Sequence, residues 1–413
     1  MIAPLLAICM KHIVLYLSFF ILHSSLFTAC AAQVKVGAEQ TDEYLPLLKD
    51  KRVALFSNHT GIVGDKHTLD LLLEDGVNVT AIFSPEHGFR GTAGAGDHVA
   101  DDVDEKTGVP ILSLYNGDLA RPSDEAMQQF DILIVDIQDV GLRFYTYYVT
   151  MARLMDACAD FHKQVIILDR PNPNGFYVDG PILDMRFKSG VGWLPIPVVH
   201  GMTLGELALM INGEHWLPDG KQCDVKVICC KNYTHQTLYR LPVAPSPNLQ
   251  NMLAIYLYPS MCYFEATPVS LGRGTDKPFL CYGHPDYDTL QSLPPLGEVW
   301  GSFTPRSMPS APKPPQQDKL CYGVDLSGMS EEEAMKHGVD LTYLIDAYKN
   351  LLPSMGRSGG APFFTPFFEK LIGVDYVRTM IQEGKSADEI RACWKQDVEH
   401  FKQQRKPYLL YRE

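Results

Sequence analysis

Short runs of apolar, β-branched residues alternate with helical stretches between about residues 50 and 200, and this alternation constrains the fold more than any other feature of the chain. Several of the expected strands are apolar throughout, as in sheets that are covered on both faces. The pattern predicts an α/β protein with a doubly wound parallel sheet. The expected strands cover residues 53–56, 77–83, 110–114, 131–137 and 165–168, and the expected helices between them cover 68–75 and 148–163.

The second half of the chain has a different pattern. Residues 294–315 contain seven prolines, which argues against regular structure there and predicts a long surface loop. Helices are expected over 330–352 and 386–404, because Ser330-x-x-Glu333 and Ser386-x-x-Glu389 each form a capping box. We place a domain boundary at residues 235–245, so that one domain covers 45–240 and a second covers 241–413.

Charge and motif content exclude several functional classes. The 413 residues carry a formal net charge of −13, so the chain lacks the basic surface that nucleic acid or anionic lipid requires. The eight cysteines after Cys30 form no C-x-x-C pair and show no zinc-module spacing. Neither a G-x-G-x-x-G fingerprint nor a P-loop motif is present. We therefore expect no nucleic-acid partner, no metal and no cofactor.

The N-terminal segment predicts export. Lys11 precedes an apolar run at 13–22 that has the length of a signal-peptide core and is too short to span a bilayer. Two interpretations of residues 1–30 remain open. Cleavage at the A-x-A-like Ala29-Cys30-Ala31 would release a periplasmic protein, whereas lipoprotein processing would lipidate Cys30 and anchor the chain to the cell envelope.

Polar residues gather directly after the expected strands, where ligands bind in open α/β sheets. Glu86 is the sharpest single candidate, because in Ser84-Pro85-Glu86-His87-Gly88 it follows an apolar strand and precedes an imidazole within a shaped turn. A carboxyl held among such partners can donate or accept a proton near neutral pH. The alternative is a solvated loop acid, or one paired with Arg90.

The ends of other strands supply further candidates. Asp136 and Asp139 flank Gln138 at the end of the strand at 131–137, with Asp136 as the last strand position, and helix capping or backbone hydrogen bonding is the alternative role. In the second half, glycines around Arg273 leave it free to clamp an anion, and Glu265 could complete a carboxylate pair with Glu86. A salt bridge from Glu265 to Arg273 or Lys277 is equally compatible with the sequence.

Together these motifs resemble the NamZ-type exo-β-N-acetylmuramidases. The resemblance is carried by residues 57–61, 84–91, 136–141, 169–173 and 265–276, and the string S-P-E-H-G-F-R-G at 84–91 is specific. It implies a Rossmann-like domain and a smaller α+β C-terminal domain that completes a cleft. It also implies release of N-acetylmuramic acid from the non-reducing ends of peptidoglycan fragments, with Glu86 as the leading catalytic residue.

Hydrolysis of a glycosidic bond needs an acid at the leaving oxygen and stabilisation of an oxocarbenium-like centre. Glu86 would be the acid, and Glu265, Asp139 or Asp136 would be the base or nucleophile, unless the substrate's own acetamido group attacks. The lactyl carboxylate of muramic acid needs a cation, for which Arg273 and then Arg90 are favoured. The expected substrate contacts are Asn58, His59, His87, Arg90, Gln138, Arg143, Tyr145, Arg170, Asn172, His200, Arg273 and Asp276.

Two other functions remain open at this stage. A metal-dependent deacetylase or amidase would use His59, His87, His98 and Asp136, and activity that survives chelation would exclude it. A non-catalytic peptidoglycan-binding lipoprotein would use the aromatic and arginine loops only as a sugar site, and a chromogenic muramoside would distinguish it. The sequence does not determine the oligomeric state or the stereochemical outcome.

Overall fold

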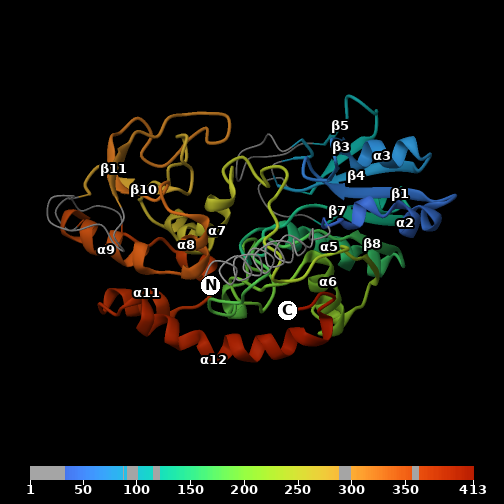
Figure 1. Ribbon diagram of the computed structural model, residues 1–413. Helices are drawn as coiled ribbons and strands as arrows, with labels where there is room; N and C mark the ends of the chain where they lie inside the picture. The colour runs from blue at the N-terminus through green and yellow to red at the C-terminus, as the bar shows by residue number, and fades with distance from the viewer. Residues whose placement is uncertain (1–32, 87, 91–100, 115–120, 288–298, 356–361) are drawn as a thin grey trace, which may run out of the picture. The chain divides into compact units, whose positions relative to one another are not determined.

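The computed structural model describes residues 33–86, 88–90, 101–114, 121–287, 299–355 and 362–413. Residues Lys35–Glu413 form one compact unit, in which the described part of the first half is built around a seven-stranded sheet (Figure 1). Neighbouring strands are parallel, except that the edge strand β5 is antiparallel to β6. In spatial order the strands are β5 (Asp102–Val103), β6 (Pro110–Ser113), β4 (Asn78–Ser84), β1 (Arg52–Ser57), β7 (Ile132–Asp136), β8 (Gln164–Leu168) and β9 (Asp224–Ile228).

The strand order confirms the predicted doubly wound sheet. The chain proceeds outward from β1 through β4 to β6, returns, and proceeds outward again from β7 through β8 to β9. The two halves meet between β1 and β7, where Ser57 pairs with Asp136 at the carboxyl ends of both strands. This is the switch point at which ligands bind in folds of this kind.

Helices cover both faces of the sheet, which explains why its strands are apolar throughout. Val53 and Leu55 of β1 pack into one core cluster with residues of α2 and α3, whereas Ala54 and Phe56 pack into another with residues of α5 and α6. Successive side chains of a strand point to opposite faces, so both sets must be apolar. The helices of this half are α2 (Thr41–Leu48), α3 (Thr68–Glu74), α4 (Asp124–Met127), α5 (Tyr147–Asp160) and α6 (Leu204–Gly213), and a two-stranded ribbon pairs β2 (Ile62–Val63) with β3 (Lys66–His67).

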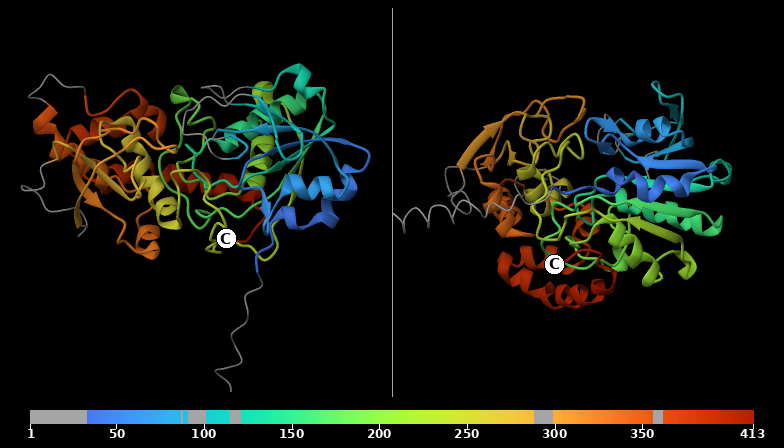
Figure 2. Two further views of the ribbon diagram at one scale, coloured as in Figure 1. Left: turned by 90° about the horizontal axis from the view of Figure 1, so that it is seen from above. Right: turned by 45° about the vertical axis from the view of Figure 1, so that its right-hand side comes forward.

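The second half combines helices with an antiparallel sheet in the order β10-β12-β11, as expected for an α+β region (Figure 1). The two views of Figure 2 show this sheet apart from the parallel sheet. The elements are α7 (Met252–Met261), the 3₁₀ helix η4 (Cys262–Ala266), β10 (Cys281–His284), β11 (Val299–Phe303), β12 (Cys321–Asp325), α8 (Glu331–His337), α9 (Thr342–Met355), α10 (Phe367–Ile372), α11 (Tyr376–Gln382) and α12 (Ala387–Arg405).

Two expectations for this half are corrected. The helix expected over 330–352 is two helices, because Gly338 adopts a left-handed φ of 61° after α8. The proline-rich segment 294–315 is not irregular throughout, since β11 forms in the proline-free run between Pro295 and Pro305 and pairs with β12. The helix at 386–404 is confirmed as α12, with its capping box between Ser386 and Glu389.

Helix α12 ties the second half to the first. Arg391 donates to the carbonyls of His337 and Val339, within the second half, at 2.6 and 2.7 Å. The Trp394 indole donates to Asp179, in the first half, at 2.9 Å. Near its end, Arg405 donates to the carbonyl of Gly201. These contacts hold the loops beyond the parallel sheet against the helical region.

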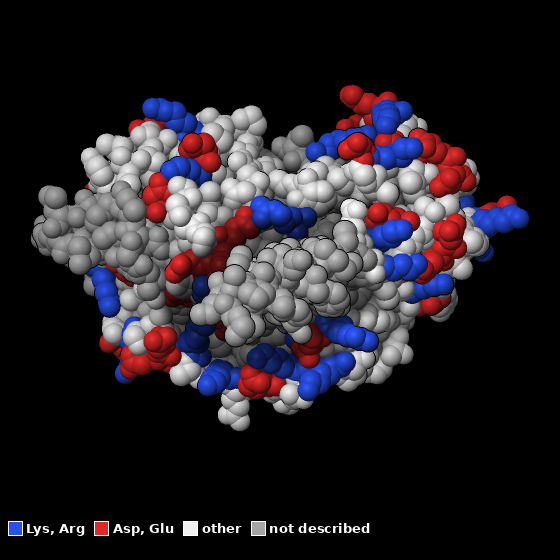
Figure 3. Space-filling view, viewed as in Figure 1, with Lys and Arg blue, Asp and Glu red and all other residues white. Residues whose placement is uncertain are grey.

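Surface charge, cysteine pairing and helix hydropathy add three further observations. Acidic and basic side chains intermingle on the face shown in Figure 3. The eight cysteines of the described ranges form no disulfide, and six of them are buried. Of the helices that the structure describes, none has the length and apolar character needed to cross a membrane.

Candidate active site

Glu86 lies just beyond the carboxyl end of β4, in a turn that closes with a hydrogen bond from the Gly88 amide to the Pro85 carbonyl at 3.0 Å. Gly88 has a φ of 75°, which favours glycine at this position. The Glu86 side chain is half-buried and accepts a hydrogen bond from Thr146 Oγ1 at 2.9 Å. Thr146 is the N-cap residue of α5, so the helix that follows β7 positions the carboxyl that follows β4.

A second carboxylate comes from the other half of the chain. Glu265 lies on η4, directly after α7, and its Oε1 accepts hydrogen bonds from Arg273 Nη2 at 2.5 Å and Nε at 3.1 Å. Gly272 and Gly274, with φ of 73° and 82°, shape the loop that carries Arg273. Burial lowers the pKa of Arg273, but the Glu265 carboxylate raises it more, so the net pKa lies above its ordinary value.

Glu86 and Glu265 line the same cavity, which has a volume of about 90 Å³. Tyr145 and Tyr147 form part of its wall, and both hydroxyls donate to the Pro245 carbonyl, at 2.8 and 3.3 Å. Aromatic walls with fixed polar tips suit a sugar ring. The lining residues are Glu86, Phe144, Tyr145, Thr146, Tyr147, Val191, Ser246, Asn248, Leu249, Tyr258, Glu265, Arg273 and Phe279.

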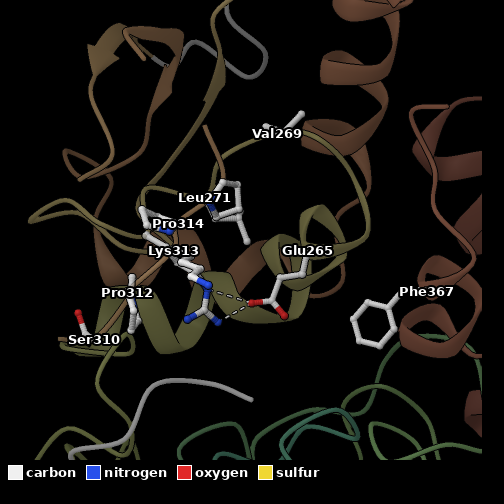
Figure 4. Close-up of a pocket in the computed structure, with 11 residues that line it drawn as sticks. Glu265, Val269, Leu271, Ser310, Pro312, Lys313, Pro314 and Phe367 are labelled. Carbon is white, nitrogen blue, oxygen red and sulfur yellow. Dashed lines mark hydrogen bonds and ion pairs between the residues drawn. The ribbon is translucent and has the colours of Figure 1, made fainter. Parts of the chain in front are cut away.

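A second cavity of about 470 Å³ adjoins the first, and Glu265 and Arg273 line both (Figure 4). Ligand pockets have volumes of about 300–1,000 Å³, so the Glu86 cavity alone is small for a saccharide. With the adjoining cavity, the space is sufficient.

Asn248 is a cavity residue that the sequence analysis missed. Its side chain is 3% exposed, its Nδ2 donates to the Ser310 carbonyl at 2.9 Å, and its Oδ1 makes no hydrogen bond within the described residues. A buried acceptor without a partner in a cavity is suited to bind a donor on a ligand. The segment 246–251 contains two asparagines and no charged residue, so its sequence resembles an ordinary turn.

Asp139 is buried and does not line the Glu86 cavity. Its Oδ1 accepts a hydrogen bond from the Gly141 amide at 2.6 Å, and burial raises its pKa to about 7. Gln138 is also buried, and its amide donates to the carbonyls of Asp139 and Pro171 at 2.8 and 2.7 Å. Both residues therefore hold the loop after β7 in shape.

Asp136 forms a buried ion pair with Arg170, and neither side chain lines either cavity. Arg170 Nε donates to Asp136 Oδ1 at 2.6 Å, and both side chains are almost fully buried. Thr68 Oγ1 also donates to Asp136, at 2.5 Å. These groups join the ends of β7 and β8 to the start of α3.

Arg143 is likewise structural. Its side chain is fully buried and donates to the carbonyls of Pro181, Ile196, Leu371 and Ile372 at 2.6–3.0 Å. Burial lowers the pKa of its guanidinium to about 10. These hydrogen bonds go to backbone carbonyls of both halves of the chain, so Arg143 fastens α10 to the loops beyond the sheet. It lines neither cavity.

Two further candidates also lie in the folded interior. Asn172 donates from Nδ2 to the Met202 carbonyl at 2.9 Å and accepts from the Asn174 amide at 2.8 Å. His200 accepts from the Met202 amide at 3.2 Å, and burial lowers its pKa to about 3, so the imidazole is neutral. Both side chains organise the loop between β8 and α6, and neither lines the two cavities.

The remaining candidates lie around the cavity rather than in it. Asn58 donates to the Tyr147 hydroxyl at 3.0 Å, and His59 Nε2 lies 2.8 Å from the Ala244 carbonyl oxygen, so both support the cavity wall. Arg90 is half exposed and pairs with Asp104, away from the Glu86 cavity. Asp276 is exposed and lines neither cavity, and His87 lies outside the described residues.

The structure describes only two of the four residues of the alternative metal site. His59 and Asp136 have the partners described above, and His87 and His98 lie outside the described residues. In the part of the chain that the structure describes, no three His, Cys, Asp or Glu side chains gather so as to hold a metal ion.

Comparisons with known proteins match most of the described unit to one family. The family Exo-beta-N-acetylmuramidase NamZ, N-terminal, matches residues 53–253, and Exo-beta-N-acetylmuramidase NamZ, C-terminal, matches residues 256–411. The chain is 38% identical over 403 residues to the Peptidoglycan beta-N-acetylmuramidase NamZ of Bacillus subtilis (strain 168), with 93% of each chain covered.

Two solved structures of DUF1343 family proteins from Bacteroides fragilis NCTC 9343 share the fold. One is 64% identical, with a TM-score of 0.83, and the match covers 92% of this chain and 100% of that one. The other is 27% identical, with a TM-score of 0.76, and the match covers 92% of this chain and 99% of that one.

Proposed function

The chain belongs to the exo-β-N-acetylmuramidase NamZ family, and on this premise we propose that it hydrolyses peptidoglycan fragments and releases N-acetylmuramic acid from their non-reducing ends. One observation links this proposal to particular residues of this chain. Two glutamates from different halves of the chain, Glu86 and Glu265, line one aromatic-walled cavity. Glycosidases act with a pair of carboxyl groups placed on either side of the scissile bond.

We assign roles to the two carboxyls from their contacts. The Arg273 guanidinium holds Glu265 in an ion pair at 2.5 Å, and we place this fixed carboxylate at the oxocarbenium-like centre. Glu86 is then the carboxyl that protonates the leaving glycosidic oxygen. The Thr146 hydroxyl orients Glu86 for this step.

Arg273 also supports recognition of muramic acid. Its Nε and Nη2 bind Glu265, whereas its Nη1 makes no hydrogen bond within the described residues. We assign the lactyl carboxylate of the substrate to this remaining face of the guanidinium, since arginine presents five N–H donors and can bind two carboxylates at once.

The test of this function compares wild-type protein with Glu86→Gln. We expect the wild type to release N-acetylmuramic acid from a chromogenic muramoside, and the variant to lose at least ~100-fold in kcat with an unchanged melting temperature. Glu332→Gln is the matched control, because this glutamate is 79% exposed on α8. Turnover by Glu86→Gln that equals that of the control would refute the assignment.

We further propose that residues 1–30 direct export and that Cys30 is lipidated. The proposed substrate lies outside the cytoplasm, and Cys30 comes shortly before Lys35, whose amide and carbonyl pair with Lys231 at the start of the folded unit. In membrane fractionation, the wild type should sediment with membranes and Cys30→Ser should not. Recovery of the wild type in the soluble periplasmic fraction would contradict lipidation.

A further inference from the structure

The second cavity, of about 470 Å³, is built between the Glu265–Arg273 pair and the proline-rich loop (Figure 4). Leu271 and Phe367 provide apolar surface, and Pro312 and Pro314 of the loop also line the cavity. Apolar faces with a few polar groups are the usual lining of sites for small organic ligands.

The proline-rich loop that lines this cavity is held in place. The Asn248 side chain donates to the Ser310 carbonyl at 2.9 Å, and the Gln316 side chain donates to the Pro268 carbonyl at 2.8 Å. Proline also restricts the backbone φ, so little conformational freedom is left to lose when a ligand binds. This part of the cavity lining is therefore preorganised.

The second cavity continues the Glu86 cavity. Glu265 and Arg273 line both, and the Asn248–Ser310 hydrogen bond joins a residue that lines the first to a residue that lines the second. A saccharide bound with its scissile bond at Glu86 and Glu265 can therefore extend into the larger space.

Lys313 is the second cation that lines this cavity, beside Arg273. Other cations of the region are paired: Lys277 binds Asp325 at 2.6 Å, and Arg273 binds Glu265. Lys313, in contrast, is exposed and makes no ion pair or hydrogen bond with the described residues. Because the Arg273 charge is offset by Glu265, Lys313 gives this cavity an uncompensated positive charge.

We propose that the second cavity binds the saccharide on the leaving-group side of the scissile bond, and that Lys313 binds a carboxylate carried by that saccharide. The inference rests on the proposed function and adds the part of the substrate that remains after the terminal residue is released. The carboxylate is either the lactyl group of a further muramic acid residue or a carboxylate of its attached peptide, and the substrates of the test separate these sources.

The test compares Lys313→Ala with the wild type on three substrates. They are a chromogenic muramoside without a leaving saccharide, a tetrasaccharide that contains a second muramic acid, and the same tetrasaccharide with peptide on that second residue. We expect KM to rise about 2- to 5-fold on a substrate whose carboxylate binds Lys313, with kcat unchanged, as for the loss of an exposed ion pair. The chromogenic muramoside should be unaffected.

Lys319→Ala is the matched control, since Lys319 is exposed beyond the same loop and lines neither cavity. A KM rise only on the peptide-free tetrasaccharide identifies the lactyl carboxylate, because that group becomes an uncharged amide when peptide is attached. A rise only on the peptide-bearing substrate identifies a carboxylate of the peptide, and a rise on both shows that Lys313 binds either one. Equal effects of Lys313→Ala on all three substrates, or no effect on any of them, would overturn the inference. The proposed function would still stand in either case, provided that the wild type releases muramic acid. A wild type that cleaves no substrate overturns both.

Discussion

Arg273 binds Glu265 through two nitrogens at the boundary between two connected cavities, with Nη2 and Nε 2.5 and 3.1 Å from the same carboxylate oxygen. The pair faces the Glu86 cavity on one side and the proline-walled cavity on the other. It therefore occupies the place where the two sugars flanking a scissile bond would meet. The sequence is compatible with Arg273 either clamping an anion or pairing with Glu265, and the structure shows the pair.

Replacing Arg273 with lysine should impair catalysis while retaining the charge. A lysine ammonium cannot reproduce the two nitrogen contacts, so the Glu265 carboxylate loses its fixed position. We expect kcat to fall by up to about 100-fold, as for a small displacement of a catalytic group. Steady-state kinetics on the chromogenic muramoside provide the measurement, and a wild-type kcat would show that the pair does not position Glu265.

Asn248→Ala should weaken substrate binding. If the buried Oδ1 accepts a hydrogen bond from an N–H or O–H of the substrate, its loss corresponds to about 0.5–1.5 kcal/mol, or about 2- to 12-fold in kcat/KM. Asn248→Asp keeps an acceptor and loses the donor to Ser310. We therefore expect Asn248→Asp to bind better than Asn248→Ala. Equal kcat/KM values for Asn248→Ala and the wild type would exclude this contact.

Arg143→Met separates a structural role from a role in binding. The substitution leaves four buried carbonyls without their donor, and each unsatisfied buried acceptor costs about 1–3 kcal/mol. We expect the free energy of unfolding to fall by at least about 3 kcal/mol in urea titrations, with little change in KM for the fraction that remains folded. A stable variant with a raised KM would instead place Arg143 at the substrate.

The carboxyl of Asp139 should make stability depend on pH. Its pKa rises from 3.8 to about 7 on folding because of burial, so the folded state binds the proton more tightly than the unfolded state. Its contribution to stability is complete below about pH 3.8 and is lost as the pH rises through 7.

Asp139→Asn isolates this effect, because asparagine stays neutral at every pH and keeps an oxygen for the Gly141 amide. The stability of the variant relative to wild type should increase between pH 4 and 7, by at most about 1.4 kcal/mol per pH unit. Urea titrations at several pH values measure the difference. Parallel pH profiles for the two proteins would contradict a raised pKa in the folded state.

The local pattern of apolar residues was sufficient to predict the parallel sheet. The expected strand at 53–56 is β1 and that at 165–168 is β8, because strands buried on both faces are recognisable as continuous apolar runs. The helix expected over 330–352, in contrast, breaks at Gly338. Its φ of 61° and the hydrogen bond from the following Val339 amide to Asp179 depend on the packing of distant segments, which sequence periodicity does not encode.

The candidate site residues also divide into those that the sequence identifies and those that only the tertiary structure places. The sequence by itself located Glu86 and Glu265, because a carboxyl in a shaped turn and a carboxyl near a glycine-flanked arginine are visible as local motifs. Whether a polar side chain after a strand faces a cavity or the core was decided only by the tertiary structure. Arg143 and Arg170 illustrate this point, since their guanidinium groups are buried against partners far along the chain.

Asn248 is the converse case, since a plain turn residue becomes a cavity acceptor only when the loop at Ser310 folds against it. Burial and partner choice depend on long-range contacts, and for that reason the sequence determined which chemistry is available and the fold determined where it is used.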